Sequence, residues 1–220
     1  MSIDPETSSH NGLAASVPGI PAVWYYDPAH YAREMATLWR QNWLYVGRSE
    51  IFTKPGAFRT LTVVDQNYLL VRGRTGSLYG FHNTCRHRGS LLCEAADGQL
   101  GTSGRIVCPY HQWTYDSEDG SLQRTSSFAE PEGFDKSVLG LFQVAVVEWC
   151  GCVFLHPHFD TRWNPDTAFQ RPADNFANFP LETMVVGHTW QAEMDCNWKT
   201  FWENFNECLH CPAVHPELTD

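Results

Sequence analysis

Two short segments, each with one cysteine and one histidine, constrain this chain more than any other feature. They are Cys85-Arg86-His87 and Cys108-Pro109-Tyr110-His111, and twenty residues separate His87 from Cys108. Two thiolates and two imidazoles form a ligand set that suits either a zinc ion or an iron–sulfur cluster. The metal that these four ligands hold decides which function the chain can have.

The residues beside these ligands favour iron over zinc. The loops CRHRGS and CPYHQW resemble those of Rieske proteins, and specifically those of the Rieske non-haem iron oxygenases. Neither loop carries the second cysteine that forms a disulfide in electron-transport Rieske proteins. The resemblance implies a Rieske [2Fe-2S] cluster in which Cys85 and Cys108 hold one iron and His87 and His111 hold the other. Zinc in a Cys2His2 site remains the alternative.

Charge and hydropathy limit the function classes. The chain has 220 residues, a net charge of −10 and no basic cluster, which argues against nucleic-acid binding. Residues 1–20 lack the apolar segment of a signal peptide, and no apolar run is long enough to span a bilayer. We therefore expect a soluble cytoplasmic protein whose thiols are reduced. Four cysteines outside the two loops are predicted to be small, buried apolar residues: Cys93, Cys150, Cys152 and Cys196.

Residues 43–155 are predicted to form a small all-β unit with the ligand loops at one tip. Strands are expected at residues 43–47, 58–64, 68–72, 78–82, 105–107, 113–115, 141–148 and 152–155, where β-branched and aromatic residues concentrate. Helices are expected at 28–43, with Asp27 as N-cap, and at 197–209, with Asn197 as N-cap and Pro212 beyond the end. Residues 156–180 are punctuated by proline and predict a connector, whereas weak alternation predicts a strand at 183–194.

A second group of metal-binding residue types lies near the C-terminal end of the sequence. Glu207, His210 and His215 form an E-x2-H-x4-H pattern, and helical spacing places Glu207 and His210 on one face. Two histidines and a carboxylate make the facial triad of non-haem Fe(II) oxygenases, which leaves positions open for O2 and substrate. Two alternatives stay open: His210 as a helix-end histidine, and Cys208 with Cys211 as a zinc or redox pair.

This second segment also resembles the Rieske oxygenase α subunit. The resemblance implies that His210 and His215 are iron ligands. It further implies that Glu207 is not a ligand but connects His210, by hydrogen bonds, with the cluster histidine His111 of a neighbouring chain. Many family members have Asp where this chain has Glu207. In the family the carboxylate ligand comes from a later helix, so we expect it beyond residue 220.

The expected fold class is mainly β with an α+β remainder. In detail, a Rieske [2Fe-2S] β-sandwich domain is joined to the start of a truncated helix-grip (START-like) catalytic domain. The domains are placed at 1–42 (N-terminal arm and helix), 43–155 (Rieske domain) and 156–220 (connector and beginning of the catalytic domain). The resemblance covers essentially all of this chain but only about the first half of a whole oxygenase subunit.

The implied function is the oxygenase component of a multicomponent Rieske mono- or dioxygenase, an enzyme of the EC 1.14 class. A flavin and iron–sulfur reductase, or a ferredoxin, would pass electrons from NAD(P)H to the cluster and on to a mononuclear Fe(II) that activates O2. The substrate would be a small organic molecule, and the branch that acts on choline, carnitine and glycine betaine is closest in sequence pattern. Aromatic compounds are the second substrate class. The resemblance also implies a homotrimer, because in this family the short electron path runs between neighbouring subunits of a head-to-tail ring. The alternatives are a Rieske electron carrier without oxygenase activity and a zinc-stabilised binding module.

Overall fold

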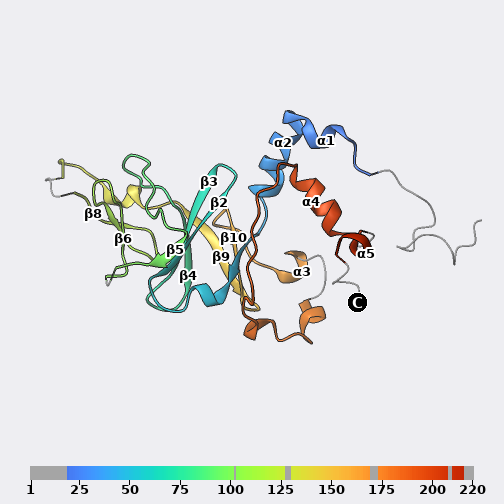
Figure 1. The fold of residues 1–220 in the computed structure, drawn as a ribbon. Coiled ribbons are helices and arrows are strands. Elements are labelled where there is room, and N and C mark those ends of the chain that lie inside the picture. Colours follow the sequence, from blue (N-terminus) through green and yellow to red (C-terminus); the bar gives the residue numbers. More distant parts are fainter. Residues whose placement is uncertain (1–18, 102, 127–129, 169–172, 208–209, 216–220) are drawn as a thin grey trace, which may run out of the picture. The chain divides into compact units, whose positions relative to one another are not determined.

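The computed structural model describes residues 19–101, 103–126, 130–168, 173–207 and 210–215 (Figure 1). The chain divides into two compact units, Glu34–Trp190 and Met1–Arg33 together with Gln191–Asp220. Each unit is described separately below. None of the helices in these described ranges has the length and apolar character needed to cross a membrane.

The larger unit is built on a seven-stranded antiparallel sheet. Its spatial order is β1-β10-β9-β4-β3-β2-β5. The strands are β1 (Leu44–Arg48), β2 (Ala57–Val63), β3 (Gln66–Arg72), β4 (Leu78–His82), β5 (Asp97–Gln99), β9 (Gln143–Trp149) and β10 (Cys152–His156). A second, three-stranded sheet runs β6 (Ile106–Val107), β7 (Thr114–Tyr115) and β8 (Leu122–Arg124).

The central strand β3 is buried on both faces, which explains its unbroken apolar run. Alternate side chains of a strand point to opposite faces. Leu69 and Val71 accordingly belong to a core that also contains Phe81 and residues of the three-stranded sheet. Tyr68 and Leu70 belong to a second core, on the side of β1 and β10. The first core is the one that receives Cys85 and Cys108, so the sheet places both thiols in an apolar interior.

Short helical turns complete this unit. They are the π-helix η1 (Met35–Trp39), the 3-10 helices η2 (Ser49–Ile51), η3 (Lys136–Leu139), η4 (Ala173–Phe176) and η5 (Leu181–Thr183), and the α-helix α3 (Pro165–Ala168). Arg48 connects β1 to η5, because its guanidinium donates to the carbonyl oxygens of Leu181 and, at 2.7 Å, Met184. The backbone N–H of Val186 donates to Glu50 over 3.0 Å.

The smaller unit contains four helices among the described residues, α1 (Val23–Tyr26), α2 (Pro28–Glu34), α4 (Trp198–Phe205) and α5 (Cys211–Val214). α1 and α4 are joined by hydrogen bonds although they lie far apart in the sequence. The Tyr25 hydroxyl donates to Glu203, and the Asn197 side chain donates to the Tyr25 carbonyl oxygen over 2.8 Å. Lys199 also lies over the Tyr25 ring, 5.8 Å from its centroid.

Most predicted strands are present within one or two residues of the expected bounds, and the mainly β class is confirmed. Three predictions about elements were wrong. Residues 183–194 contain no strand, the first helical segment ends at Trp39, and the last predicted helix ends at Phe205. Both predicted N-caps are present: Asp27 accepts from the N–H of Ala29, and Asn197 from that of Lys199, each over 3.0 Å.

Candidate functional site

The two Cys/His loops have the same backbone construction. In the first loop, the N–H of Gly89 donates to the Cys85 carbonyl oxygen over 3.0 Å. The N–H of Cys85 donates to the Ser90 carbonyl oxygen over 2.8 Å. In the second loop, the N–H of Gln112 donates to the Cys108 carbonyl oxygen over 3.0 Å. The N–H of Cys108 donates to the Trp113 carbonyl oxygen over 2.8 Å. Each cysteine therefore begins a six-residue turn, in which its carbonyl oxygen accepts from the fifth residue and its amide donates to the sixth.

The fifth residue of each loop adopts the same unusual conformation. Gly89 has φ 73°, and Gln112, at the equivalent position, has φ 60°. Positive φ is easy for glycine but costs an L-residue roughly 1–2 kcal/mol. The second loop thus accepts backbone strain in order to match the first, and this equivalence was not predicted from the sequence.

The two thiols lie together in the core. Cys85 is 3% exposed and Cys108 is 1% exposed, and both belong to the same apolar cluster. Burial, as the largest effect, raises the pKa of Cys85, and the neighbouring Cys108 thiol acts in the same direction. A thiolate pair here would need a cation beside it, because two buried negative charges repel each other and are poorly solvated.

A buried tyrosine contacts one of these sulfurs. Tyr115 is completely buried, and its Oη lies 3.2 Å from the Cys85 Sγ. The backbone N–H of Arg86 donates to the same Oη over 3.1 Å. Burial, and then the contact with Cys85, raise the pKa of Tyr115, so the hydroxyl stays protonated and can donate to a thiolate.

The two imidazoles form a second pair, separate from the thiols. The His87 and His111 rings have centroids 4.8 Å apart. His87 stacks on Trp113 at 4.7 Å, and His111 stacks on Tyr110 at 3.8 Å. His87 is exposed and His111 is half-buried, so this pair faces outward while the thiols face the core. Desolvation, followed by the nearby His111 and Arg88, lowers the pKa of His87, which favours the neutral, metal-binding form.

Arg86 secures the first loop against the segment that precedes β9. Its guanidinium donates to the Gly140 carbonyl oxygen over 2.9 Å and lies over the Phe142 ring, 3.9 Å from the centroid. Sequence reasoning did not identify Arg86, Trp113 or Tyr115 as parts of the site. A hydroxyl-bearing aromatic residue two positions after Trp113, on the strand that leaves the second loop, was the available signal for Tyr115.

The C-terminal group comes together within the smaller unit. The Glu207 Oε1 lies 2.5 Å from the His210 Nδ1, and the His210 and His215 rings have centroids 5.6 Å apart. The contact between Glu207 and His210 was expected on one helix. It forms instead across a turn, because α4 ends at Phe205 and His210 caps α5. Cys208 lies outside the described residues, and Cys211 is half-buried.

The described cysteines are all free thiols. Cys93, Cys150 and Cys152 are half-buried, whereas Cys196 is exposed, so the prediction that Cys196 is buried was wrong. Throughout the part of the chain that the structure describes, no three His, Cys, Asp or Glu side chains form a group able to hold one metal ion. The ligand candidates are therefore arranged as the pairs given above.

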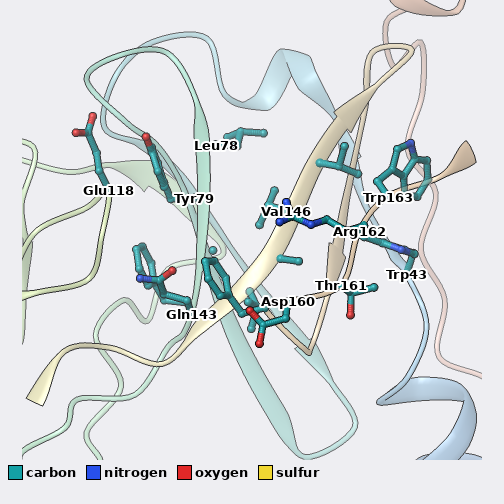
Figure 2. Close-up of a pocket in the computed structure, with 16 residues that line it drawn as sticks. Trp43, Leu78, Tyr79, Glu118, Gln143, Val146, Asp160, Thr161, Arg162 and Trp163 are labelled. Atoms are coloured by element: carbon teal, nitrogen blue, oxygen red, sulfur yellow. The ribbon is translucent and has the colours of Figure 1, made fainter. Parts of the chain in front are cut away.

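A cavity of about 450 Å³ lies elsewhere in the larger unit, over β4 and β9 (Figure 2). Tyr79 and Glu118 lie on one side of it, and Trp43 and Trp163 on the other. None of the residues that line this cavity is one of the predicted metal ligands. The two Cys/His loops therefore do not line this cavity.

Comparison with known proteins identifies both regions. The Rieske [2Fe-2S] domain family matches residues 42–139, and the ring hydroxylating alpha subunit (catalytic domain) family matches residues 181–220. The glycine betaine monooxygenase oxygenase subunit of Chromohalobacter salexigens is 34% identical over 208 residues, which are 90% of this chain and 43% of that protein. The chloroplastic choline monooxygenase of Beta vulgaris is 30% identical over 217 residues, 96% of this chain and 46% of that protein.

Solved structures agree with these matches. The quaternary ammonium Rieske monooxygenase CntA in complex with L-carnitine superposes with a TM-score of 0.78 at 28% identity. The match covers 90% of this chain and 55% of that one, so the chain spans about half the length of the relatives it matches. On its sequence, its fold and both family matches, the chain belongs to the Rieske non-haem iron oxygenase α subunits.

Proposed function

We propose that this chain supplies the electron-accepting Rieske centre, and two iron ligands, of an oxygenase component. The observation that carries the proposal is the division of the four loop ligands into two neighbouring pairs. A buried thiol pair, Cys85 with Cys108, lies in the core, and an outward imidazole pair, His87 with His111, lies at the surface. Two sulfur ligands on one iron and two nitrogen ligands on the other are what a Rieske [2Fe-2S] cluster requires.

The surrounding residues fit that group. The apolar core around Cys85 and Cys108 excludes water from the sulfurs, and the Tyr115 hydroxyl is placed to donate to the Cys85 sulfur. The exposed ring of His87 gives an external redox partner access to the histidine side. This arrangement supports electron entry and exit through the histidines and not through the buried thiols.

We propose a second metal site on His210 and His215. The Glu207 carboxylate contacts the Nδ1 of His210, so the Nε2 is the ring nitrogen left for a metal. The third, carboxylate ligand is proposed to lie outside the residues of this chain. When bound, the two groups supply one-electron transfer at the [2Fe-2S] cluster and O2 activation at a mononuclear Fe(II).

The substrate class proposed is a small quaternary amine. The support comes from the relatives, which are named as glycine betaine and choline monooxygenases, and from the L-carnitine complex of a similar structure. α4 also carries three mutually contacting rings, Phe201, Trp202 and Phe205, which are exposed in this structure. Aromatic faces attract such cations. Product analysis with glycine betaine, carnitine and a panel of arenes tests this assignment, and turnover of arenes alone would contradict it.

The proposed partners are a reductase or ferredoxin, which supplies electrons that originate from NAD(P)H, and further copies of the same chain. A homotrimer is the proposed assembly, in which Glu207 reaches the His111 of a neighbouring copy through a head-to-tail contact that closes into a ring. A reducing, cytoplasmic setting is proposed on the free state of the described cysteines.

Metal and sulfide analysis of the purified chain tests the cluster assignment. The expected result is iron and acid-labile sulfide in about equal amounts, with a visible absorption spectrum. Cys85→Ser should lose both, whereas Cys93→Ser, at a half-buried cysteine packed on the same core, should retain both. A colourless sample loaded with zinc would refute the proposal.

A further inference from the structure

A pair of cysteines outside both metal-ligand groups lies at the turn between β9 and β10. Trp149 and Cys152 are directly paired across the two strands, so Cys150 and Gly151 form a two-residue hairpin loop. Their φ values are 50° and 71°, which is the signature of a type I′ turn. The sequence Cys-Gly-Cys therefore presents two thiols on one tight turn.

The spacing of the two cysteines suits a disulfide. Residues two apart have Cα atoms at most about 7 Å from each other, and disulfides span about 4.4–6.8 Å between Cα atoms. The two thiols are near enough to interact electrostatically, since Cys152 contributes to the raised pKa of Cys150, after the larger effects of burial and of Glu182. The Cα separation that a disulfide needs is therefore within reach at this turn.

A guanidinium contacts one of the two thiols. Arg48 donates through Nη1 to the Cys152 Sγ over 2.9 Å and to the Cys150 carbonyl oxygen over 3.1 Å. Gly151 makes this approach possible, because a Cβ at that position would collide with the Arg48 guanidinium. The Arg48 guanidinium therefore fixes the position of the Cys152 sulfur beside the turn.

The other cysteine, Cys150, lines a cavity of about 420 Å³. Its lining combines Cys150 with the aromatic residues Trp149, Phe176 and Phe179 and with the carboxylate-bearing Glu182. A small molecule can therefore reach Cys150 through this cavity, whereas Cys152 lies against Arg48. The two cysteines therefore differ in access, and Cys150 is the thiol that an external disulfide meets first.

We propose that Cys150 and Cys152 are a redox-active dithiol that forms a reversible disulfide with a low-molecular-weight disulfide, such as oxidised glutathione, entering through this cavity. The Cys150 thiolate attacks one glutathione sulfur, the glutathione S–S bond breaks, and the first glutathione leaves with a proton. The Cys152 thiolate then attacks the Cys150 sulfur, which forms the intrachain S–S bond and releases the second glutathione. The two thiol hydrogens end on two glutathione molecules, so the two cysteines are oxidised and one disulfide is reduced.

The sequence provides a direct assay. Cleavage after Lys136 and Arg162 releases peptide 137–162, which contains Cys150 and Cys152 and no other cysteine. The intact, cluster-loaded chain is equilibrated anaerobically with glutathione buffers of increasing oxidation and quenched with acid and N-ethylmaleimide. It is then digested, and the masses of its peptides are measured by mass spectrometry. Peptide 137–162 is expected to lose two hydrogens at oxidising ratios and to regain both thiols at reducing ratios, while the visible absorption of the cluster is unchanged.

Single variants separate the two roles. Cys152→Ser should accumulate one glutathione on Cys150, because nothing resolves the mixed disulfide, whereas Cys150→Ser should accumulate at least about tenfold less. Cys196→Ser, the same change at an exposed cysteine outside the pair, should behave as the unsubstituted chain. The proposal is overturned if peptide 137–162 of the unsubstituted chain keeps both thiols at every ratio, or if its cysteines are found joined only to cysteines elsewhere in the chain.

Discussion

Replacing Tyr115 by Phe removes one hydroxyl and leaves the ring that fills the core. That hydroxyl lies 3.2 Å from the Cys85 Sγ and is fully buried. A hydrogen bond to a sulfur ligand stabilises the reduced cluster more than the oxidised one, because reduction adds negative charge. Hydrogen bonds to charged groups are worth roughly 1.5–3 kcal/mol, and if about half of that is differential the change is about 1 kcal/mol. For a one-electron couple this corresponds to a reduction potential lower by about 40 mV.

The same substitution should also lower stability. The Arg86 N–H donates to the Tyr115 Oη over 3.1 Å and would lose this acceptor. An unsatisfied buried donor costs roughly 1–3 kcal/mol, which chemical denaturation of the cluster-loaded chain can measure.

Potentiometric titration, followed by the visible absorption of the cluster, measures the potential. Tyr110→Phe is the matched control, because Tyr110 lies on the same loop and is 61% exposed, so its hydroxyl can be solvated. The control should shift the potential by much less than the core variant. An unchanged or higher potential in Tyr115→Phe, with the cluster intact, would show that the hydroxyl does not donate to the cluster sulfur.

Three further predictions concern the loops, the second metal group and the sheet. Gly89→Ala should destabilise the first loop by roughly 1–2 kcal/mol because the residue has positive φ, although no atom obstructs the new Cβ. Gln112→Gly, at the equivalent position, should not destabilise the second loop. Equal losses of stability in the two variants would contradict the explanation from positive φ. Glu207→Gln should leave the cluster spectrum intact and lower coupled turnover about 10- to 100-fold, and unchanged turnover would remove its proposed role. The hydrogen bond from Arg72 is the largest effect that holds the pKa of Glu148 below its ordinary 4.5, so the pair's contribution is present above that pH and is lost as the pH falls through the lowered pKa. Glu148→Gln should therefore cost roughly 0.5–1 kcal/mol at pH 7 and progressively less as the pH falls below the ordinary pKa of 4.5, and a loss independent of pH would refute the ion-pair explanation.

The sequence was sufficient to predict that the two Cys/His loops lie together, and the structure places their thiols in one core and their imidazoles in one pair. It could not predict how the loops match. The positive φ of Gln112 has no signal in its residue type, and it is recognised only beside Gly89 in the structure. Tyr115 was predicted as part of a strand, and its contact with Cys85 depends on how two sheets meet.

The wrong strand at residues 183–194 has a physical explanation. Alternation of apolar residues indicates a possible strand, but a strand also needs a partner for its backbone groups. Here the Met184 carbonyl oxygen accepts from Arg48, and the Val186 N–H donates to Glu50. These backbone groups are therefore hydrogen-bonded to side chains and not to a neighbouring strand. Conversely, β5 was missed because all three of its residues are exposed and none is apolar, although it pairs with β2.

The predicted C-terminal helix was too long for a similar reason. Helical spacing indicated contact between Glu207 and His210, but the backbone leaves the helix at Asn206, whose N–H caps the Trp202 carbonyl oxygen. The contact nevertheless forms across the turn. Spacing of side chains was therefore a better guide to the site than the element assigned to them.

Mössbauer spectroscopy of the chain loaded with enriched iron tests the central claim most directly, because it reports the ligands of each iron separately. Two iron sites of equal area are predicted, one with sulfur ligands only, through Cys85 and Cys108, and one with mixed sulfur and nitrogen ligands, through His87 and His111. A single class of iron in the loops, or loops that bind zinc and no iron, would contradict the account.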